Sequence, residues 1–295
     1  MGYFSYEKSP RVRLPKLTLF VGQEAPPIMW QDDRPGENPF TAMLFQQDYT
    51  HLRVEEIRPV GGQSSTNRLL QCTGTAPGSG RVEAMDVPRT GADQPLGRLD
   101  YEVLDNQTAD LVYTGKLIHW RNSVPATLKT PLPLLFSASS GAEGHQFGRQ
   151  QFLENEGPLP EGLYTFLTHV DPEQNSVKAA NKLGERAVTN NYRQGIQFLP
   201  MDGSVPKYPA WGTMRVRLTQ IKGDTLGRPG GYFLHNSQKG YSHGCIEVGK
   251  TAGGVDFFNA LLIHARSPAR RPKLTVLVTY SYPEQSTRGK TKVSE

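Results

Sequence analysis

The sequence predicts a mainly β protein built from two domains. At 295 residues the chain is long enough for two ordinary domains, and its 36% hydrophobic content with 30 Gly and 23 Pro is typical of a globular chain rich in strands and turns. Short runs of β-favouring residues recur between clusters of turn residues along most of its length. Only one segment has a clear helical periodicity. We therefore expect two mostly β domains, with one helix in the second.

Four β-favouring runs predict the strands of a first domain that covers residues 1–85. These runs are 17–21, 51–57, 68–74 and 81–87. The Gly-rich turn between the last two, in the sequence CTGTAPGSGRVEA, resembles the last hairpin of immunoglobulin-like modules. The resemblance implies an immunoglobulin-like β-sandwich that serves as an accessory or adaptor domain. Cys72 lies inside one of the runs and is expected to be a small buried residue.

A linker is expected at 86–98, because PRTGADQPLGR contains two prolines, two glycines and few apolar residues. The second domain then covers 99–282, and the polar segment 283–295 is expected to be a flexible tail. The strands of the second domain are predicted from the alternation of apolar residues and from composition. The segment 111–120 is expected to form a hairpin that turns at Thr114 and Gly115. These predicted strands lie within 111–120, 132–141, 157–170 and 273–282.

The single helix is expected over 251–266. Val255, Phe258, Leu261 and Leu262 recur there at helical spacing. Thr251 is in position to cap the helix, and Asp256 lies near its positive end.

Charge and hydropathy restrict the classes of function. Residues 1–100 hold 11 Lys and Arg against 12 Asp and Glu, and the rest of the chain holds 22 against 16. The basic excess of the second part suits either a solvated surface or an anionic polymer such as cell wall. It lacks dense basic runs with interleaved aromatic residues, so we expect no nucleic-acid partner. No apolar run approaches the ~18 residues of a membrane span, and residues 1–20 lack the features of a standard secretory signal.

The residues that predict chemistry are concentrated in 227–250, GRPGGYFLHNSQKGYSHGCIEVGK. An apolar strand over 232–234 would deliver His235 at its end, within reach of Cys245. The thiolate is the reactive form of cysteine, so we expect His235 to act as base and the pKa of Cys245 to lie below the free value of ~8.5. Gly244 permits a sharp turn, after which the amides of Gly244 and Cys245 could stabilise an oxyanion.

A family resemblance rests on these residues. The string Ser242-His243-Gly244-Cys245-Ile246, preceded by a histidine at the end of an apolar strand, resembles the signature of L,D-transpeptidase (YkuD-type) domains. The short separation between histidine and cysteine is most similar to L,D-transpeptidase-like effectors of type VI secretion systems. Segments 113–117, 136–141 and 155–164 also resemble those effectors, so the resemblance extends over about 100–282.

The resemblance implies an acyl transfer on peptidoglycan stem peptides that needs no cofactor and no metal. Cys245 would attack the carbonyl between an L-centre and a D-residue, and His235 would take the thiol proton. The carbonyl of Asn236 would orient the imidazole. His243 would either lie on the oxyanion side with Gly244 and Cys245 or brace the loop. Residues implied to bind substrate are Arg228, which suits a carboxylate, Tyr232 and Ser242.

The acceptor decides which product forms. Water gives L,D-carboxypeptidase action, a D-amino acid gives exchange, and a neighbouring stem gives a cross-link. Many transpeptidases carry Arg or Asn where this chain has Glu247, so acceptor recognition is expected to differ, with a bias toward hydrolysis or exchange. The resemblance further implies an antibacterial effector made in the cytoplasm without a signal peptide, exported, and active in the periplasm of a target bacterium. Secretion-apparatus components and an immunity protein are the implied partners.

Other hypotheses remain open at this point. His235, His243 and Cys245 are legitimate zinc ligands, with Glu247 nearby, and the chain could instead be a non-catalytic cell-wall-binding or adaptor module. A papain-like amidase is disfavoured because those families place the cysteine before the histidine. The remaining histidines have no metal-ligand spacing and are expected to be structural or on the surface. They are His51, His119, His145, His169 and His264.

Overall fold

The computed structural model describes most of the second half of the chain and a smaller part of the first. The described residues fall into two compact units, one within 1–107 and the other within 108–280 and 284–295. Both are mainly β, as expected. The described residues are 3–6, 9–14, 16–21, 24–25, 27–31, 43–46, 50–57, 68–86, 95–105, 108–121, 134–190, 192–223, 228, 230–280 and 284–292.

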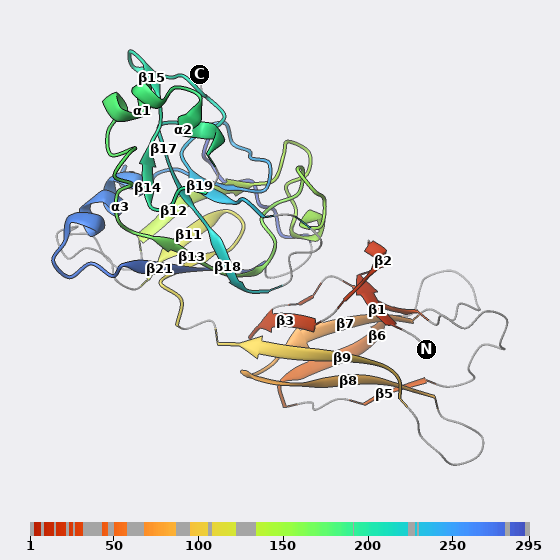
Figure 1. The fold of residues 1–295 in the computed structure, drawn as a ribbon. Coiled ribbons are helices and arrows are strands. Elements are labelled where there is room, and N and C mark those ends of the chain that lie inside the picture. Colours follow the sequence, from red (N-terminus) through yellow and green to blue (C-terminus); the bar gives the residue numbers. More distant parts are fainter. Residues whose placement is uncertain are drawn as a thin grey trace. The chain divides into compact units, whose positions relative to one another are not determined.

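The first unit is a pair of β-sheets (Figure 1). One sheet has the order β2-β1-β4-β7-β6 and the other β3-β9-β8-β5. Its strands are β1 Tyr3–Tyr6, β2 Ser9–Arg13, β3 Lys16–Phe20, β4 Ile28–Gln31, β5 Met43–Gln46, β6 Leu52–Ile57, β7 Arg68–Gly74, β8 Gly78–Asp86 and β9 Pro95–Leu104. When β1 and β4 to β9 are lettered A to G in chain order, the sheets contain A-B-E-D and C-F-G, which is the immunoglobulin arrangement. The predicted immunoglobulin-like sandwich is therefore confirmed.

The sandwich is held by side chains that alternate inward along its strands. Trp30 of β4 and Tyr101 of β9 are among the largest fully buried side chains. Cys72 of β7 is buried as expected, and burial raises the pKa of its thiol to about 12. This cysteine is a packing residue.

The predicted domain boundary is wrong. Strand β9 begins at Pro95, inside the expected linker 86–98, and it pairs with both β3 and β8. Leu99, Tyr101 and Val103 are buried at every second position, so this segment completes the first sandwich and does not open the second domain. Its proline stands at the first strand position, where a missing N–H is tolerated. The boundary between units falls at 107/108, and 87–94 lie outside the described residues.

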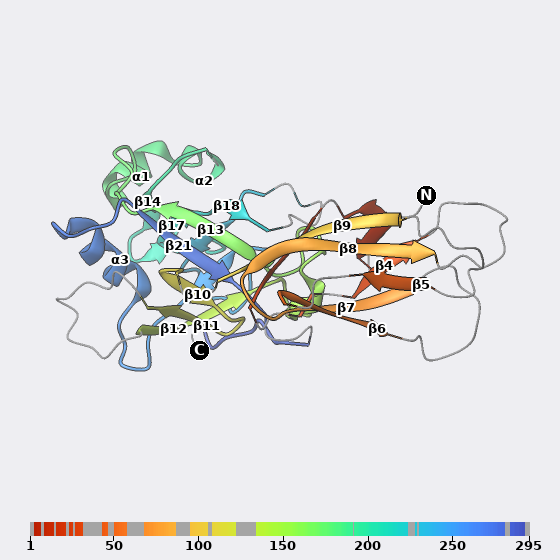
Figure 2. The ribbon, with the colours of Figure 1, turned by 90° about the horizontal axis from the view of Figure 1, so that it is seen from below.

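The second unit is organised around one curled ten-stranded sheet (Figures 1 and 2). The strand order is β14-β17-β19-β20-β12-β11-β10-β21-β13-β18. Its strands are β10 Leu111–Tyr113, β11 Leu117–Trp120, β12 Leu134–Ser140, β13 Gly162–Leu167, β14 Ile196–Phe198, β17 Met214–Arg217, β18 Thr219–Lys222, β19 Phe233–His235, β20 Ile246–Val248 and β21 Lys273–Val278. A small separate hairpin is formed by β15 Met201–Asp202 and β16 Val205–Pro206. The curl brings β13 into contact with β17, so the sheet wraps around its own core.

Helix α3, Phe257–Arg266, covers this core after the predicted nucleophile. Its N-cap is Asp256, which accepts from the Asn259 amide, whereas the Thr251 hydroxyl accepts from the Val255 amide in the preceding turn. The expectation that Thr251 caps the helix is therefore wrong. Val255 and Leu262 pack against the core, and Phe258 and Leu261 are fully buried, as the periodicity predicted.

Two short helices were not predicted. They are α1, Val177–Leu183, and α2, Arg186–Thr189, and a single 3-10 turn, η1, lies at Gly148–Gln150. Ser176 caps α1 by accepting from the Ala179 amide. Each helix is too short for an apolar period to stand out. Both precede Cys245, so among the described residues α3 is still the one helix expected after the predicted nucleophile.

The expected flexible tail is also wrong for 284–292. This segment, here called the strap, forms a β-bridge between Ser286 and Phe147, and it buries Thr287 and Thr291. The Thr287 carbonyl accepts from the Ser140 amide, the Thr287 amide donates to the Gln146 carbonyl, and the Gly289 amide donates to the hydroxyl of Ser139. A Cβ at Gly289 would lie 2.0 Å from the Ala138 carbonyl oxygen, so the missing side chain allows this close approach. The sequence did not predict that the strap is ordered, because its composition is polar and hydrogen bonds, which leave no apolar pattern, hold it in place.

Among the described residues, no helix has both the length and the apolar content needed to cross a membrane.

Candidate active site

Strand pairing brings the predicted nucleophile and base to one face of the sheet. Strands β19 and β20 are parallel neighbours, with Leu234 opposite Ile246. Cys245 precedes this paired position and His235 follows it, so the alternation of side chains along a strand directs both to the same face. Leu234 and Ile246 point to the opposite face and are buried in the core. The apolar approach strand was correctly predicted to end at His235.

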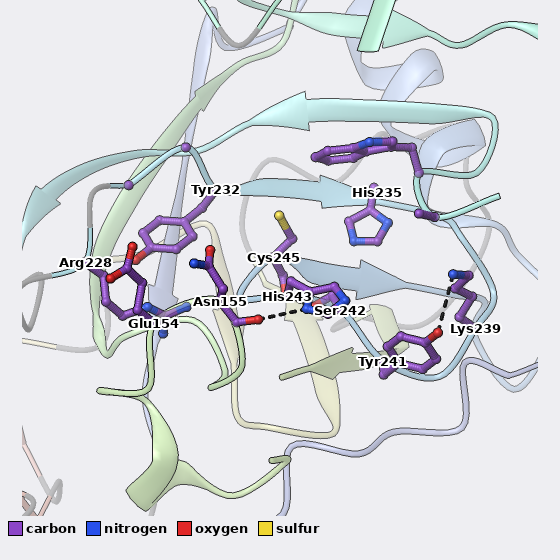
Figure 3. Close-up of a pocket in the computed structure, with 14 residues that line it drawn as sticks. Glu154, Asn155, Arg228, Tyr232, His235, Lys239, Tyr241, Ser242, His243 and Cys245 are labelled. Atoms are coloured by element: carbon purple, nitrogen blue, oxygen red, sulfur yellow. Dashed lines mark hydrogen bonds between the residues drawn. The ribbon is translucent and has the colours of Figure 1, made fainter. Parts of the chain in front are cut away.

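Cys245 and His235 line one cavity of about 360 Å³. Figure 3 shows both side chains directed into it. The other lining residues are Glu154, Asn155, Ala210, Trp211, Arg228, Gly230, Gly231, Tyr232, Lys239, Tyr241, Ser242 and His243. Predicted site residues Arg228, Tyr232, Ser242 and His243 all reach this cavity.

The backbone of the nucleophile is fixed by a sharp turn. The Cys245 carbonyl accepts hydrogen bonds from the hydroxyls of Ser140, at 2.7 Å, and Ser242. Gly244 has φ of +93°, and a Cβ there would lie 2.2 Å from Nη2 of Arg228. Glycine is therefore required at 244 both by the backbone angle and by the guanidinium.

The predicted oxyanion amides are available. In the part of the chain that the structure describes, neither the Gly244 N–H nor the Cys245 N–H donates to an acceptor. His243 is exposed and does not complete this pair, because its Nδ1 is 2.8 Å from the Asn155 carbonyl oxygen. A carbonyl only accepts, so Nδ1 carries the hydrogen and donates it. This contact favours the second expected role of His243, which is to brace the neighbouring loop.

The expectation of an ionised thiol at rest is wrong. Burial raises the pKa of Cys245 to about 11, against the opposing effects of a hydrogen bond from the Phe233 amide and of the charges of Arg215 and Arg228. Burial also lowers the pKa of His235 to about 3, helped by the charges of Arg215 and Lys239. At neutral pH the resting pair is thus a thiol and a neutral imidazole. Such an imidazole has a free lone pair and can accept the thiol proton during attack.

Packing, and not the Asn236 carbonyl, orients the imidazole. Nδ1 of His235 is buried without a hydrogen-bond partner among the described residues. The Asn236 side chain instead accepts from the amides of Thr213 and Met214. The ring of Trp211 lies edge-on to His235, with centroids 5.6 Å apart. The predicted role of Asn236 is therefore corrected: it holds the turn that presents Trp211.

Arg228 and Tyr232 form one end of the cavity. The Arg228 guanidinium donates to the carbonyls of Gln151, Gly157 and Pro158, and it lies 5.3 Å from the centroid of the Tyr232 ring. No carboxylate among the described residues pairs with it. The Tyr232 hydroxyl is buried without a partner. A fixed cation and a free hydroxyl at one end suit a substrate carboxylate, as predicted for these two residues.

Ser242 lines the cavity, but its polar groups are already engaged. Its hydroxyl donates to Cys245 and its amide donates to Gly141. The expected role in substrate binding is therefore corrected to support of the nucleophile turn.

Glu247 is not among the residues that line the cavity. It is fully buried, and its carboxylate accepts from the Ser237 hydroxyl and from the amides of Lys239 and Gly240, the latter two at 2.8 and 2.7 Å. Residues 237–240, here called the anchored loop, lead from His235 toward Cys245. Glu247 therefore sets the path of the chain between base and nucleophile.

Arg215 is a site residue that the sequence did not reveal. It is fully buried on β17, directly opposite His235. The Cζ atom of its guanidinium lies 4.7 Å from the centroid of the Trp211 ring and 4.5 Å from that of the Phe233 ring. Its guanidinium donates to Gln197 and to the carbonyls of Ala187 and Val188. Burial lowers its pKa to about 10, so it remains charged at neutral pH. The only sequence signal is an arginine inside the apolar strand MRVRL, and nothing in the sequence indicates its neighbours.

The zinc hypothesis has no geometric support. Within the described ranges, no three His, Cys, Asp or Glu side chains are grouped so as to hold a metal ion. Of the described histidines, only His235 and His243 line the cavity. His264, for example, is buried on α3 against Trp120.

Comparisons with known proteins do not identify the chain. No protein-family model matches it, and no curated protein matches it. A solved structure of the surface layer protein SbsC, domains 1–6, aligns with a TM-score of 0.25 and 12% identity. That alignment covers 45% of this chain and 18% of the surface layer protein. Likeness at this level carries no argument about function.

Proposed function

We propose that the second unit is a cysteine-dependent acyltransferase that acts on peptidoglycan stem peptides, as an L,D-carboxypeptidase or L,D-transpeptidase. The observation that carries this proposal is the cavity that Cys245 and His235 line together. Among the described residues, the amides of Gly244 and Cys245 donate no hydrogen bond. The Ser-His-Gly-Cys-Ile string at 242–246 supports the choice of substrate. The short separation between histidine and cysteine supports an exported antibacterial effector.

The proposed reaction has two steps. Cys245 attacks the carbonyl between an L-centre and the terminal D-alanine, while neutral His235 accepts the thiol proton. The carbonyl oxygen becomes an oxyanion near the amides of Gly244 and Cys245. His235 then returns the proton to the leaving amine, which releases D-alanine and leaves a thioester. Water or an amine attacks the thioester and regenerates the thiol.

The charge of the cavity supports a carboxylate-bearing substrate. Arg228 and Lys239 line the cavity and Arg215 lies behind its wall, whereas Glu154 is the acidic residue on the lining. Stem peptides end in a carboxylate, which Arg228 is placed to receive.

The test is a digest of purified tetrapeptide muropeptides with wild type and Cys245→Ala, followed by mass analysis. Loss of D-alanine without a new bond indicates hydrolysis, and added D-amino acid or a dimer indicates exchange or cross-linking. The alanine variant is expected to show none of these. An unchanged wild-type digest would exclude this activity on tetrapeptides.

One observation favours a second candidate, a non-catalytic cell-wall-binding module. A thiol with a pKa of about 11 is a weak nucleophile when no substrate is bound. Sedimentation of wild type and Cys245→Ala with insoluble peptidoglycan separates the two candidates: equal retention without any product favours the binding module.

A further inference from the structure

A second hollow of about 730 Å³ lies in the second unit, away from Cys245. It is formed between the β11 and β12 strands, the segment that joins β20 to α3, and the strap. We call it the strap groove. Nothing in the proposed acyl transfer uses it, because its lining residues differ from those of the catalytic cavity.

Five basic side chains line the strap groove: Lys116, Lys250, Arg288, Lys290 and Lys292. All five are exposed, and none forms an ion pair with a described residue. Asp256 is the acidic residue of the lining, and its carboxylate already accepts from the Asn259 amide as the cap of α3. The groove therefore carries a concentrated positive charge that the described part of the protein does not neutralise.

The strap fixes the position of three of these cations. Thr287 and Thr291 point inward and are buried, so Arg288, Lys290 and Lys292 at the alternate positions point outward. The hydroxyl of Ser139 binds both the Gly289 backbone and the Thr291 hydroxyl, the latter at 2.8 Å. A row of cations on a hydrogen-bonded backbone loses less conformational entropy on binding than the same residues on a free tail.

The lining also has an apolar part. Leu117 pairs with Ser137 and His119 with Leu135, so Leu117 and Leu135 lie on the same face of neighbouring strands. Leu135 is 41% exposed and Leu117 is partly exposed. The groove thus combines an apolar floor with a basic rim.

We propose that the strap groove binds an acidic segment of a partner protein, with carboxylates on the basic rim and an apolar side chain on Leu117 and Leu135. Charge complementarity selects an anionic partner. A nucleic acid is disfavoured because no aromatic ring lines the groove to stack on a base. An anionic polymer without apolar groups would leave the leucine floor exposed.

The test measures binding of fluorescein-labelled peptides to the full chain by fluorescence anisotropy. The probe is EELEELEE, and its matched control is EESEESEE, which has the same charge and no apolar side chain. We expect EELEELEE to bind about tenfold more tightly than EESEESEE, and Leu135→Gln to reduce this difference. The binding of EELEELEE to the wild-type chain is expected to weaken when the salt concentration rises.

Two charge-matched double variants test the location. K290Q/K292Q removes two cations of the groove, and K178Q/K182Q removes two exposed lysines of α1. We expect the first to weaken binding about tenfold and the second to change it less than twofold. These side chains are exposed, so both variants should fold, which circular dichroism checks.

Three results would overturn the proposal. The first is equal affinity of wild type and K290Q/K292Q for EELEELEE, and the second is an equal loss in both double variants. The third is tighter binding of polyphosphate or of single-stranded DNA than of EELEELEE in competition, which would assign the groove to a polyanion.

Discussion

Arg215 places a positive charge behind the cavity where solvent cannot screen it. The guanidinium lies between two aromatic rings, a geometry that stabilises a desolvated cation. Its charge lowers the pKa values of both Cys245 and His235. It therefore makes the thiol easier to ionise and keeps the imidazole neutral.

Removal of this charge is expected to raise the pKa of Cys245 further. In Arg215→Met, alkylation of Cys245 by iodoacetamide at pH 9 should slow several-fold, because less thiolate forms. Arg215→Lys keeps a charge and should restore most of the rate. Mass analysis of the labelled peptide distinguishes Cys245 from Cys72, whose raised pKa makes it the internal control. An unchanged rate in a folded Arg215→Met protein would contradict the assigned electrostatic effect.

His235 makes the stability of the protein depend on pH. Its pKa is 6.5 in the unfolded chain and about 3 in the folded one, so the unfolded state binds the extra proton first as the pH falls. The contribution to stability is complete above pH 6.5 and is lost toward pH 3, at about 1.4 kcal/mol per pH unit. Urea denaturation at pH 7 and pH 4 should show a smaller loss in His235→Gln than in wild type. Equal losses in both proteins would mean that His235 is protonated in the folded state.

At the scale of an element, the anchored loop is held by one buried carboxylate. Two backbone amides and a hydroxyl donate to Glu247, and hydrogen bonds to a charged acceptor are stronger than neutral ones. The strap lies against the same loop, since a Cβ at Gly240 would contact the Lys292 side chain at 3.1 Å. The chain between His235 and Cys245 is thus supported from two sides.

Glu247→Gln is expected to lower the free energy of unfolding by about 1.5–3 kcal/mol. The amide group of glutamine would place a donor against donors, so the loop would lose its anchor. Chemical denaturation measures the change, and the alkylation rate of Cys245 reports on the site. Glu284→Gln is the matched control, because its ion pair with Arg149 is exposed and should contribute less than about 1 kcal/mol. Similar losses in the two variants would argue against the anchoring role.

At the scale of the whole molecule, the described residues form two compact units with separate cores. Every residue that lines the cavity of Cys245 and His235 belongs to the second unit. The residues that line the strap groove also belong to the second unit. Each unit therefore contains its own buried apolar residues and hydrogen-bonded sheets, which is the property of a domain that folds alone.

Residues 108–295 expressed alone are expected to fold and to keep the Cys245 alkylation rate within about twofold of the full chain. The dependence of this alkylation rate on pH should also match that of the full chain, because Arg215, Arg228 and Lys239 are all retained. Thermal denaturation and peptide mass analysis provide the measurements. A protein that aggregates or loses the cavity would show that the second unit depends on the first.

The sequence by itself determined the mainly β class, the immunoglobulin-like sandwich, the strand that ends at His235 and the turn that presents Cys245. These features depend on local period and on residues such as Gly244, whose backbone angle few other residues adopt. The tertiary structure decided the rest. Only strand pairing brings Arg215 opposite His235, only burial raises the pKa of Cys245 above its free value, and only contacts distant in sequence hold Glu247 and the strap. Register and desolvation are properties of the packed chain, and a local pattern of residues does not encode them.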